Sequence, residues 1–402
     1  AWLLMSNPGM IDELLDSLLL ERLPTLESLQ AGVGELCRGA VDVDAILHAF
    51  KASQQLRVGV RDILGRQDAD ATTAALSAIA EALVSEVVRR EEGLLAERLG
   101  APTGPDGGRA GPVVLAMGKF GGREMNYASD VDVIFLYDKE GSVVPPRGRA
   151  GGTSNAHFFG ELAQRTMRIF NTFGPQGRLY EMDSRLRPSG KSGPPAVSLD
   201  EFARYFSADG PAAIWERQAL LKARPVVGRP DAVARAAAII AAATVGRRWT
   251  AEDVEAIRRM RYRMEQGARA GNLKRGPGGV VDIEFIVQML QLVHGGREPA
   301  VRTTETLPGL VALHAAGLIA AERFTFLERA YRTLRSIEGR LRLLDAVARH
   351  DFPVAPEEQR KLAHLLGYDR PDALVQDVQA TTARTRAEFE RIFNETEARL
   401  GR

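Results

Sequence analysis

The feature that most constrains the fold is a change in hydrophobic period between residues 99 and 113. Before this break, apolar residues recur at three- and four-residue steps, which predicts a long helix. They are Leu76, Ile79, Leu83, Val87 and Val88. After the break, VVLAM (113–117) is a short apolar run and VDVIFLY (131–137) is rich in β-forming residues, so we expect two buried strands. The chain therefore passes from helices into a core that contains a sheet.

The following segments complete this core. AHFFGELAQRTMRIFNTF (156–173) has helical spacing, and RLYEMDSRLRP (178–188) is expected to form a third strand. The order helix, strand, strand, helix, strand predicts an α+β fold. Helices are expected again from about residue 197, where Ser198 is a suitable N-cap with Glu201 three residues later. The segment WERQALLKAR (215–224) is predicted to be helical as well.

A long apolar stripe occupies the last third of the chain, and its spacing is typical of the core of a helical bundle. It comprises Phe324, Leu327, Tyr331, Leu334, Ile337, Leu341 and Leu344. We therefore expect three parts: a helical region over 1–100, an α+β core over 111–228 and a helical bundle over 229–402.

Charge and cysteine content limit the partners and the compartment. The 402 residues carry 53 basic and 52 acidic side chains, a net charge of +1, whereas electrostatic binding of nucleic acid favours a basic excess. The single cysteine, Cys37, excludes an intrachain disulfide and a cysteine-based metal site, and it suits a reducing cytoplasm. No apolar run approaches the length of a membrane span. We expect a cytoplasmic protein that binds neither nucleic acid nor membrane.

Two acidic residues interrupt the apolar strand. Side chains at positions i and i+2 of a strand share a face, so Asp130 and Asp132 are expected to project together and to repel each other unless a cation lies between them. Mg²⁺ suits such a pair, because it takes one or two carboxylates and completes its shell with water and phosphate oxygens. The alternative is a strand end whose acids are merely solvated.

A glycine-rich turn follows the first expected strand. Gly118 and Lys119, with Gly121 and Gly122, come directly after it. Glycines let backbone amides approach a phosphate group, and the lysine adds positive charge. On its own such a turn is usually structural.

A third acid, Asp183, lies in the next expected strand and is flanked by Arg185 and Arg187. If that strand pairs beside 131–137, three carboxylates can hold two Mg²⁺ ions, which stabilise the attacking and leaving oxygens of a displacement at phosphorus. One of the acids would also take the proton of the nucleophile.

A strand, a small-residue turn, a DxD pair and a third aspartate on a neighbouring strand resemble the nucleotidyltransferase superfamily typified by DNA polymerase β. The resemblance implies a polymerase-β-like core over 111–228, with a small mixed sheet flanked by helical domains. In that superfamily a Gly-Ser pair usually stands in the turn. Here Gly118-Lys119 takes its place, so the serine contact to phosphate is missing.

Longer motifs resemble a narrower family, glutamine synthetase adenylyltransferase (glutamate–ammonia-ligase adenylyltransferase). They are GKFGGREMNYASDVDVIFLY, YEMDSRLRPSGKSGP, WERQALLKAR and GGVVDIEFIVQ, and the opening NPGMIDELLD is also similar. That family has two homologous nucleotidyltransferase halves, and this chain resembles one of them. The amino-terminal half removes AMP from glutamine synthetase and the carboxy-terminal half attaches it. DELLD, LRPSG, WERQAL and VDIEF are similar to the adenylylating half, whereas LKRGPGG is closer to the removing half.

The resemblance assigns roles by position. It implies metal binding by three carboxylates, those of Asp130, Asp132 and Asp183. It implies contacts to the ATP triphosphate from Gly118, Lys119, Gly121 and Gly122, with Ser129 at the edge of the metal site. Further nucleotide contacts are implied for Arg185, Arg187, Lys222 and Arg224. For the arginines at 185 and 187, pairing with nearby carboxylates is an equally good expectation. Arg217 is expected, at least as readily, to lie on a solvated face of its helix.

The motif GPGGVVDIEFIVQ has two interpretations. Gly278 and Gly279 are expected to break the chain before a helix that carries Asp282 and Glu284. Either an acid here closes the nucleotide site from the helical domain, or Asp282 caps the helix and fixes the interdomain angle. The second is favoured, because an acid near a helix start interacts well with the helix dipole.

The resemblance implies transfer of AMP from ATP to a tyrosine hydroxyl of glutamine synthetase, with release of pyrophosphate. In the family, glutamine and the PII signalling protein set which activity prevails. Three alternatives remain. They are phosphorolytic removal of AMP, a silent fold that only binds glutamine synthetase or a PII-type regulator, and a nucleotidyltransferase that extends nucleic acid. The clustered acids argue against the silent fold and the neutral charge argues against the last.

Overall fold

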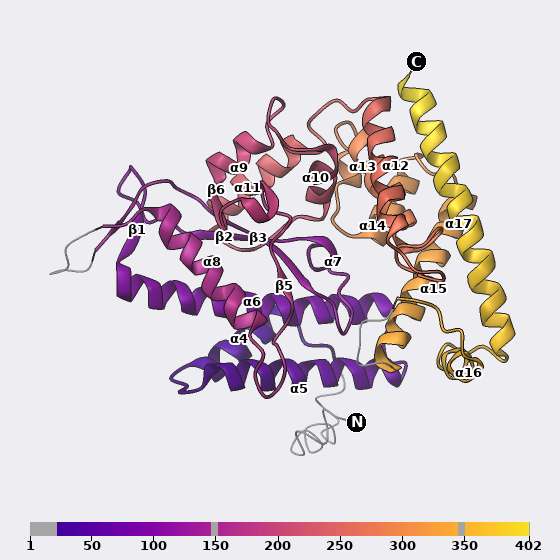
Figure 1. Cartoon of the computed structure of the whole chain (residues 1–402), viewed down its shortest axis with the longest axis horizontal. Helices are drawn as coiled ribbons and strands as arrows, with labels where there is room; N and C mark the ends of the chain where they lie inside the picture. Colours follow the sequence, from indigo (N-terminus) through magenta and orange to yellow (C-terminus); the bar gives the residue numbers. More distant parts are fainter. Residues whose placement is uncertain (1–21, 146–151, 345–349, 402) are drawn as a thin grey trace. The chain divides into compact units, whose positions relative to one another are not determined.

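A mixed five-stranded sheet forms the core of the first part of the computed structural model, which describes residues 22–145, 152–344 and 350–401 (Figure 1). Its strands are β2 (Pro112–Ala116), β3 (Val131–Tyr137), β5 (Met182–Asp183), β6 (Ala196–Ser198) and β7 (Arg224–Val227). Strand β2 pairs antiparallel with β3 and β7, while β3 pairs in parallel with β5 and β6. The expected small mixed sheet is confirmed.

Strand β3 has the bounds that the sequence predicts, and it is buried from Val133 to Tyr137. The apolar run drives this burial, because each side chain removed from water stabilises the fold. Strand β5 is much shorter than the expected segment 178–188 and covers two residues. The prediction was wrong for the rest of that segment, which is irregular before β5 and forms turns after it.

From residue 22 onward, the helices that precede the sheet are α4 (Leu26–Cys37), α5 (Val43–Ile63) and α6 (Ala69–Leu99). Helix α6 begins where the Asp68 carboxylate accepts a 2.8 Å hydrogen bond from the Ala71 amide. It ends at Gly100, which has a φ of +108°. The predicted amino-terminal helices are confirmed within the described residues, whereas the opening NPGMIDELLD lies outside them.

By length and composition, helix α6 is apolar enough to cross a membrane, which the sequence interpretation did not anticipate. However, 72% of its most apolar window is buried inside the structure. Helix α8 (Asn155–Asn171) packs against it, so α6 is a core helix of this part of the molecule.

A second, smaller sheet lies beside the core elements in sequence. It pairs β1 (Ala101–Thr103) with β4 (Ser142–Val144). Ser198 does cap helix α9 (Leu199–Tyr205), because its hydroxyl accepts a hydrogen bond from the Glu201 amide at 3.1 Å.

The segment WERQALLKAR is only partly helical. It contains α10 (Ile214–Ala219) and the short 3₁₀ helix η2 (Leu220–Lys222), and then strand β7. Arg224 therefore stands in a strand, contrary to the sequence prediction.

The chain divides into two compact units. The first comprises Ala1–Tyr205 and Ala223–Ile239, and the second comprises Phe206–Lys222 and Ile240–Arg402. Each unit has a buried apolar cluster. The short segment around α10 thus belongs to the second unit, although β7 returns to the first. The division at residues 100 and 228 that the sequence predicts stays a prediction.

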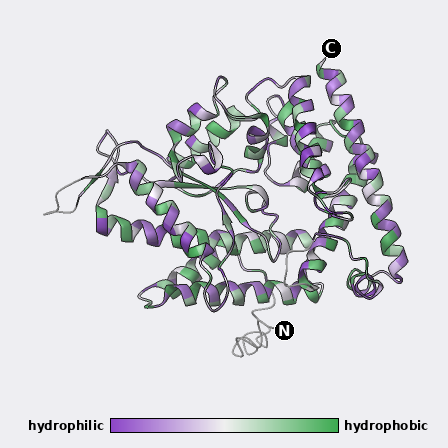
Figure 2. Ribbon diagram, in the orientation of Figure 1, coloured by the Kyte–Doolittle hydropathy of each residue, from purple (hydrophilic) through white to green (hydrophobic). Residues whose placement is uncertain are grey.

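The second unit is helical where the structure describes it. Besides α10 and η2, its helices are α11 (Pro230–Ala243), which spans the boundary, α12 (Ala251–Gln266), α13 (Val280–His294), η3 (Pro299–Val301), α14 (Thr306–Ala315), α15 (Ala321–Leu344), α16 (Pro356–Leu365) and α17 (Pro371–Leu400). The apolar stripe predicted at 324–344 lies on α15, where Leu327, Leu334 and Ile337 are fully buried. Figure 2 shows hydrophobic and hydrophilic residues interspersed along these helices, as expected of amphipathic bundle elements.

Candidate functional site

The parallel pairing of β3 with β5 brings two predicted site residues together. Asp132 lies opposite Asp183 in the register of these strands. Neighbouring residues in register direct their side chains to the same face of a sheet, so the two carboxylates share one face. A shared carboxylate site required the third strand to pair beside 131–137, and it does.

Asp130 lies just outside this pair. Strand β3 begins at Val131, so Asp130 precedes the strand and is exposed, whereas Asp132 is half-buried. The expectation that both acids lie within the strand was wrong for Asp130. Among residues 22–145, 152–344 and 350–401, no three acidic, histidine or cysteine side chains converge closely enough to hold a metal ion.

Arg185 holds the carboxylate of Asp183. Its Nε donates to Asp183 Oδ2 at 2.6 Å, and its backbone amide donates to Asp183 Oδ1 at 2.8 Å. Burial raises the pKa of Asp183, but these hydrogen bonds and the charge of Arg185 outweigh it, so the pKa is lowered. The hydrogen bond to Asp183 raises the pKa of Arg185, and the charge of Asp132 adds to this effect. Arg185 thus braces Asp183.

The glycine-rich turn lies against the Asp132 side chain. Helix α7 (Gly118–Gly121) is a single turn that follows β2, and Gly118 has a φ of +52°. A Cβ atom on Gly118 would lie 2.7 Å from Asp132 Oδ2. The backbone amide of Met117 also donates to the Asp132 carbonyl at 2.8 Å. A side chain at 118 would strain the left-handed backbone and displace the nearby carboxylate, so glycine is favoured there.

Backbone hydrogen bonds within the turn hold the rest of it. The amide of Gly122 donates to the Gly118 carbonyl at 3.0 Å, and the amide of Gly121 to the Met117 carbonyl at 2.8 Å. Lys119 is half-buried in the same turn. The predicted contacts of these residues with a triphosphate stay predictions.

Arg224 anchors this turn rather than extending from it. Its Nε donates to the Gly121 carbonyl at 3.1 Å and its Nη2 to the Phe120 carbonyl at 3.4 Å. An ion pair of 2.7 Å joins its Nη1 to Glu81 on helix α6. The sequence analysis missed Glu81, because nothing local in a helical repeat marks one buried acid as the partner of a distant arginine.

Ser129 and Arg187 support the loops next to the carboxylates. The buried Ser129 hydroxyl accepts a 2.8 Å hydrogen bond from the Asn126 amide. Arg187 Nη1 donates to the Ser184 carbonyl at 2.8 Å, and its Nη2 to the Gly193 carbonyl at 3.2 Å. Burial lowers the pKa of Arg187. Of the two arginines expected to pair with acids, Arg185 does so, whereas Arg187 donates to carbonyl and hydroxyl oxygens.

A lysine that the sequence analysis missed supports the approach to β5. Lys51 of helix α5 donates to the Leu179 carbonyl, and its ammonium lies 4.1 Å from the centre of the Tyr180 ring. Desolvation lowers the pKa of Lys51 to about 8. No sequence signal identifies this contact, since the partners are 128 residues apart.

Lys222 and Arg217 belong to the second unit. The buried Lys222 ammonium donates to the Thr306 hydroxyl at 2.9 Å. Arg217 is only 4% exposed and donates to the carbonyls of Phe206 and Ser207, both at 2.7 Å. The solvated face expected for Arg217 was therefore wrong.

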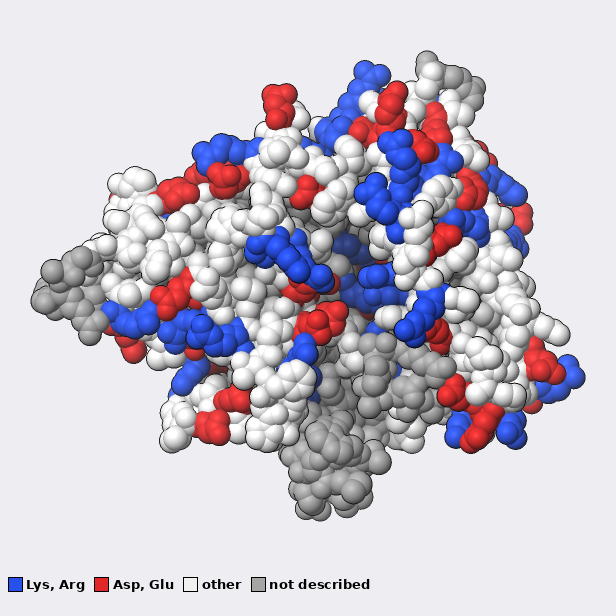
Figure 3. Space-filling view, viewed as in Figure 1, with Lys and Arg blue, Asp and Glu red and all other residues white. Residues whose placement is uncertain are grey.

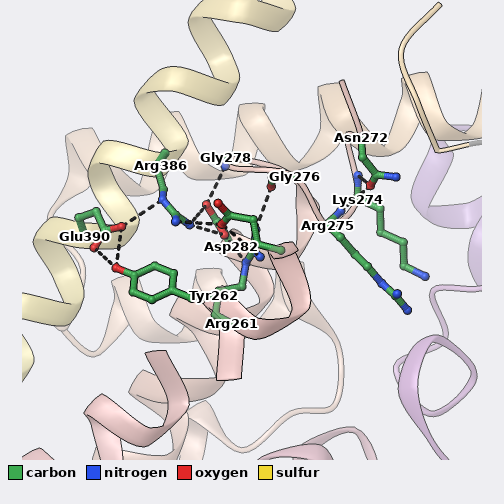
Figure 4. Close-up of polar contacts among 11 residues, drawn as sticks. Arg261, Tyr262, Asn272, Lys274, Arg275, Gly276, Gly278, Asp282, Arg386 and Glu390 are labelled. Atoms are coloured by element: carbon green, nitrogen blue, oxygen red, sulfur yellow. Dashed lines mark hydrogen bonds and ion pairs between the residues drawn. The ribbon is translucent and has the colours of Figure 1, made fainter. Parts of the chain in front are cut away.

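Asp282 forms a buried ionic network at the start of α13 (Figure 4). Asp282 is fully buried and pairs with Arg261 of α12, which is also fully buried. It also pairs with Arg386 of α17, whose Nη1 lies 3.2 Å from its Oδ2. Its Oδ2 accepts a 2.7 Å hydrogen bond from the Gly278 amide just before the helix. Burial raises the pKa of Asp282, and both arginines oppose this. The helix-capping interpretation is supported within this unit, and Glu284 has no part in the network drawn.

The donor chemistry at the sheet suits a hard cation. Asp132 and Asp183 offer carboxylate oxygens from adjacent strands, and Asp130 lies one residue before β3 begins. Mg²⁺ takes such ligands and keeps coordination positions for water and phosphate oxygens. The residues therefore fit Mg²⁺ in kind, with Asp183 shared by Arg185 in the present arrangement.

Comparison with known proteins gives two family matches. Residues 1–239 match the model described as glutamate-ammonia ligase adenylyltransferase, and residues 251–396 match the model described as GlnD PII-uridylyltransferase. The first match ends where the first structural unit ends, at Ile239.

Similar curated proteins carry one name, bifunctional glutamine synthetase adenylyltransferase/adenylyl-removing enzyme. The protein of Burkholderia pseudomallei is 35% identical over 364 residues, 85% of this chain and 39% of that protein. The protein of Xanthomonas axonopodis pv. citri is 34% identical, over 86% of this chain and 36% of that protein. The protein of Nitrosococcus oceani is 32% identical, over 87% and 36%. The chain thus spans less than two fifths of the length of these relatives.

Proposed function

The chain belongs to the glutamate-ammonia ligase adenylyltransferase family, and we propose that it transfers AMP from ATP to a tyrosine hydroxyl of glutamine synthetase, releasing pyrophosphate. The C–O bond of the tyrosine stays intact. The phenolic oxygen bonds to the α-phosphorus of ATP as the bond from that phosphorus to the pyrophosphate oxygen breaks. The phenolic proton passes to solvent water as the tyrosine oxygen attacks. This polymerase-β-like chemistry is assigned to the five-stranded sheet of the first unit.

One observation carries the proposal: Asp132 and Asp183 lie in register on adjacent strands, and Gly118 packs against Asp132. A fold that only bound a partner would gain nothing from two carboxylates on one face, since like charges at that spacing repel. A glycine turn pressed against one of them suits the approach of a third, anionic group. Both features favour a phosphate-handling site over a binding module.

Mg²⁺ would be held by Asp130, Asp132 and Asp183, and it would supply charge stabilisation at the attacking and leaving oxygens. The chain itself would bind and orient the nucleotide through the turn of Gly118, Lys119, Gly121 and Gly122, with Ser129, Arg185, Arg187, Lys222 and Arg224 as further predicted contacts. Because its pKa is lowered, Asp183 is a weak base, and it suits a charged ligand role better than the removal of a phenolic proton, whose pKa is about 10.

The test uses glutamine synthetase, Mg²⁺ and α-labelled ATP, with intact-mass analysis of the synthetase. We expect label on its subunit from the unmodified chain and none from Asp132→Asn. Asp106→Asn is the matched control, because this exposed acid of the same unit pairs with Lys139 at 2.5 Å outside the sheet. Label that persists in Asp132→Asn would remove the site assignment.

The same assay separates the alternatives. Release of ADP from adenylylated synthetase in the presence of phosphate, without labelling, would assign the chain to AMP removal. If neither activity is detected, the silent binding module remains as the interpretation.

The family also suggests partners and a location. We propose glutamine and a PII-type protein as effectors, and the match of residues 251–396 to a PII-uridylyltransferase model supports a link to PII signalling. We also propose a cytoplasmic location, to which the free, buried Cys37 is suited.

A further inference from the structure

The loop Asn272–Gly279, between α12 and α13, has a backbone that tolerates no side chain at its glycines. A Cβ atom on Gly276 would lie 2.4 Å from the Asn272 carbonyl oxygen. On Gly278, whose φ is +70°, it would lie 1.8 Å from the Thr382 carbonyl oxygen of α17. The glycines therefore let the loop pack directly on neighbouring backbone.

Buried charges fix the same loop. Arg261 Nη2 donates to the Gly276 carbonyl at 2.8 Å, while Asp282 accepts from the Gly278 amide at 2.7 Å. Arg386 contacts the same carboxylate at 3.2 Å from α17. Two helices and the start of a third thus hold eight residues of loop, which is more than a plain connection between helices needs.

This loop presents two cations side by side. The Asn272 side-chain oxygen accepts from the backbone amides of Lys274 at 3.1 Å and Arg275 at 2.7 Å, and its amide nitrogen donates to Asp351 at 2.8 Å. Figure 4 shows the side chains of Lys274 and Arg275 extending together, away from Asp282. In the part of the chain that the structure describes, no hydrogen bond or ion pair involves either cationic side-chain group.

We propose that Lys274 and Arg275 form an anion-binding element whose ligand is a phosphate group, that of a nucleotide or free inorganic phosphate. An ordinary solvated lysine needs neither the glycine packing nor the buried ion pairs beneath it. A rigid backbone that sets two cations together lowers the entropy that binding must overcome. The planar fork of arginine and the compact ammonium of lysine both suit phosphate oxygens.

The nucleotide as source rests on the proposed function, whereas phosphate binding by the loop does not. ATP would supply the phosphate in AMP attachment, and inorganic phosphate would supply it in AMP removal. The element is a phosphate-recognising set of residues of the second unit, and no step of the transfer chemistry is assigned to it.

Titration calorimetry of the full chain at low salt, with ATP, AMP and inorganic phosphate as separate probes, tests this. The double variant Lys274→Gln/Arg275→Gln should bind at least one probe roughly tenfold more weakly, as loss of charge-assisted hydrogen bonds implies. Arg360→Gln, an exposed arginine on α16 of the same unit, should bind each probe as the unmodified chain does.

The pattern across probes identifies the source. Weaker ATP binding alone supports a triphosphate ligand, weaker phosphate binding supports free phosphate, and equal weakening of ATP and AMP supports the α-phosphate. Unchanged affinity for all three probes overturns the proposal even if AMP transfer is observed. A tenfold loss in a chain that transfers no AMP supports the loop and removes only the proposed function.

Discussion

At Asp183, two opposing influences act on one carboxyl group. Burial raises its pKa, and hydrogen bonds from Arg185 lower it by more. Removing the side chain in Arg185→Ala takes away the dominant lowering influence, so the pKa of Asp183 should rise. Because the site needs a charged Asp183, protonation would then occur at higher pH, and the acid limb of the activity profile should move upward. The measurement is the rate of AMP transfer against pH.

Arg204→Ala is the control for this prediction. Arg204 is an exposed arginine of the same unit that pairs with Glu201 three residues away. It should leave the acid limb in place. An unchanged profile in Arg185→Ala would show that protonation of Asp183 does not limit the reaction.

The carboxylate of Asp282 compensates two arginines in the bundle. Asp282→Asn keeps the shape and the acceptor for the Gly278 amide but removes the charge opposite Arg261, which is fully buried. Breaking one partner of such a buried pair costs about 3–5 kcal/mol of unfolding free energy. Urea denaturation followed by circular dichroism measures this loss.

The matched control is Glu284→Gln, two residues along α13 and half-exposed. We expect a change below about 0.5 kcal/mol, which is usual for substitutions away from buried networks. Equal losses in both variants would contradict the assignment of Asp282 as the anchor of the network.

At the scale of the element, the turn α7 is coupled to strand β3. In Gly118→Ala, the left-handed backbone costs about 1–2 kcal/mol, and the new methyl group displaces the carboxylate of Asp132. A displacement of about 1 Å can lower a rate by roughly a hundredfold. AMP transfer should therefore fall far more than the stability implies, and parallel rate and urea measurements show this.

Gly160→Ala provides the contrast. Gly160 lies within helix α8, and a Cβ atom there meets nothing within 4 Å. Alanine in a helix interior should stabilise the protein by roughly 0.5–1 kcal/mol and leave the rate unchanged. A comparable loss of rate in both glycine variants would contradict the role of the turn.

Predictability from sequence also differs by element. Strand β3 has its predicted bounds, because seven apolar-rich residues fix a buried strand by themselves. Strand β5 has only two residues, and its existence depends on pairing with β3 rather than on local preference. Arg224 was placed in a helix because WERQALLKAR suits one, yet pairing with β2 converts its end to strand β7. Long-range pairing decided these elements.

The candidate site shows the same limit. A shared face for Asp132 and Asp183 follows from strand geometry once the strands are known to pair. The contacts of Arg224 with Glu81 and of Lys51 with Leu179 join segments far apart in the chain. Residue type and spacing give no information about such contacts, so the sequence could propose the carboxylates but not the groups that hold them.

At the scale of the whole molecule, charged residues and buried apolar residues are distributed differently. On the face drawn in Figure 3, acidic and basic side chains are widely interspersed, in keeping with a net charge of +1. The apolar residues, in contrast, form a cluster in each unit. The segment Phe206–Lys222 joins the second cluster, although its neighbours in sequence belong to the first unit. Its sequence contains no linker signal that would have placed the boundary there.

Two separate cores predict that the units lose protection separately. Leu83 on α6 and Leu334 on α15 are fully buried, one in each cluster. Truncation of either to alanine should cost about 2–5 kcal/mol. Hydrogen exchange read by mass spectrometry should then show faster exchange across the first unit in Leu83→Ala, and across the second unit in Leu334→Ala. Peptides from 206–222 should follow Leu334→Ala. Uniform acceleration in both variants would instead mean that the chain unfolds as one cooperative body, and the division into units would then describe packing without independent stability.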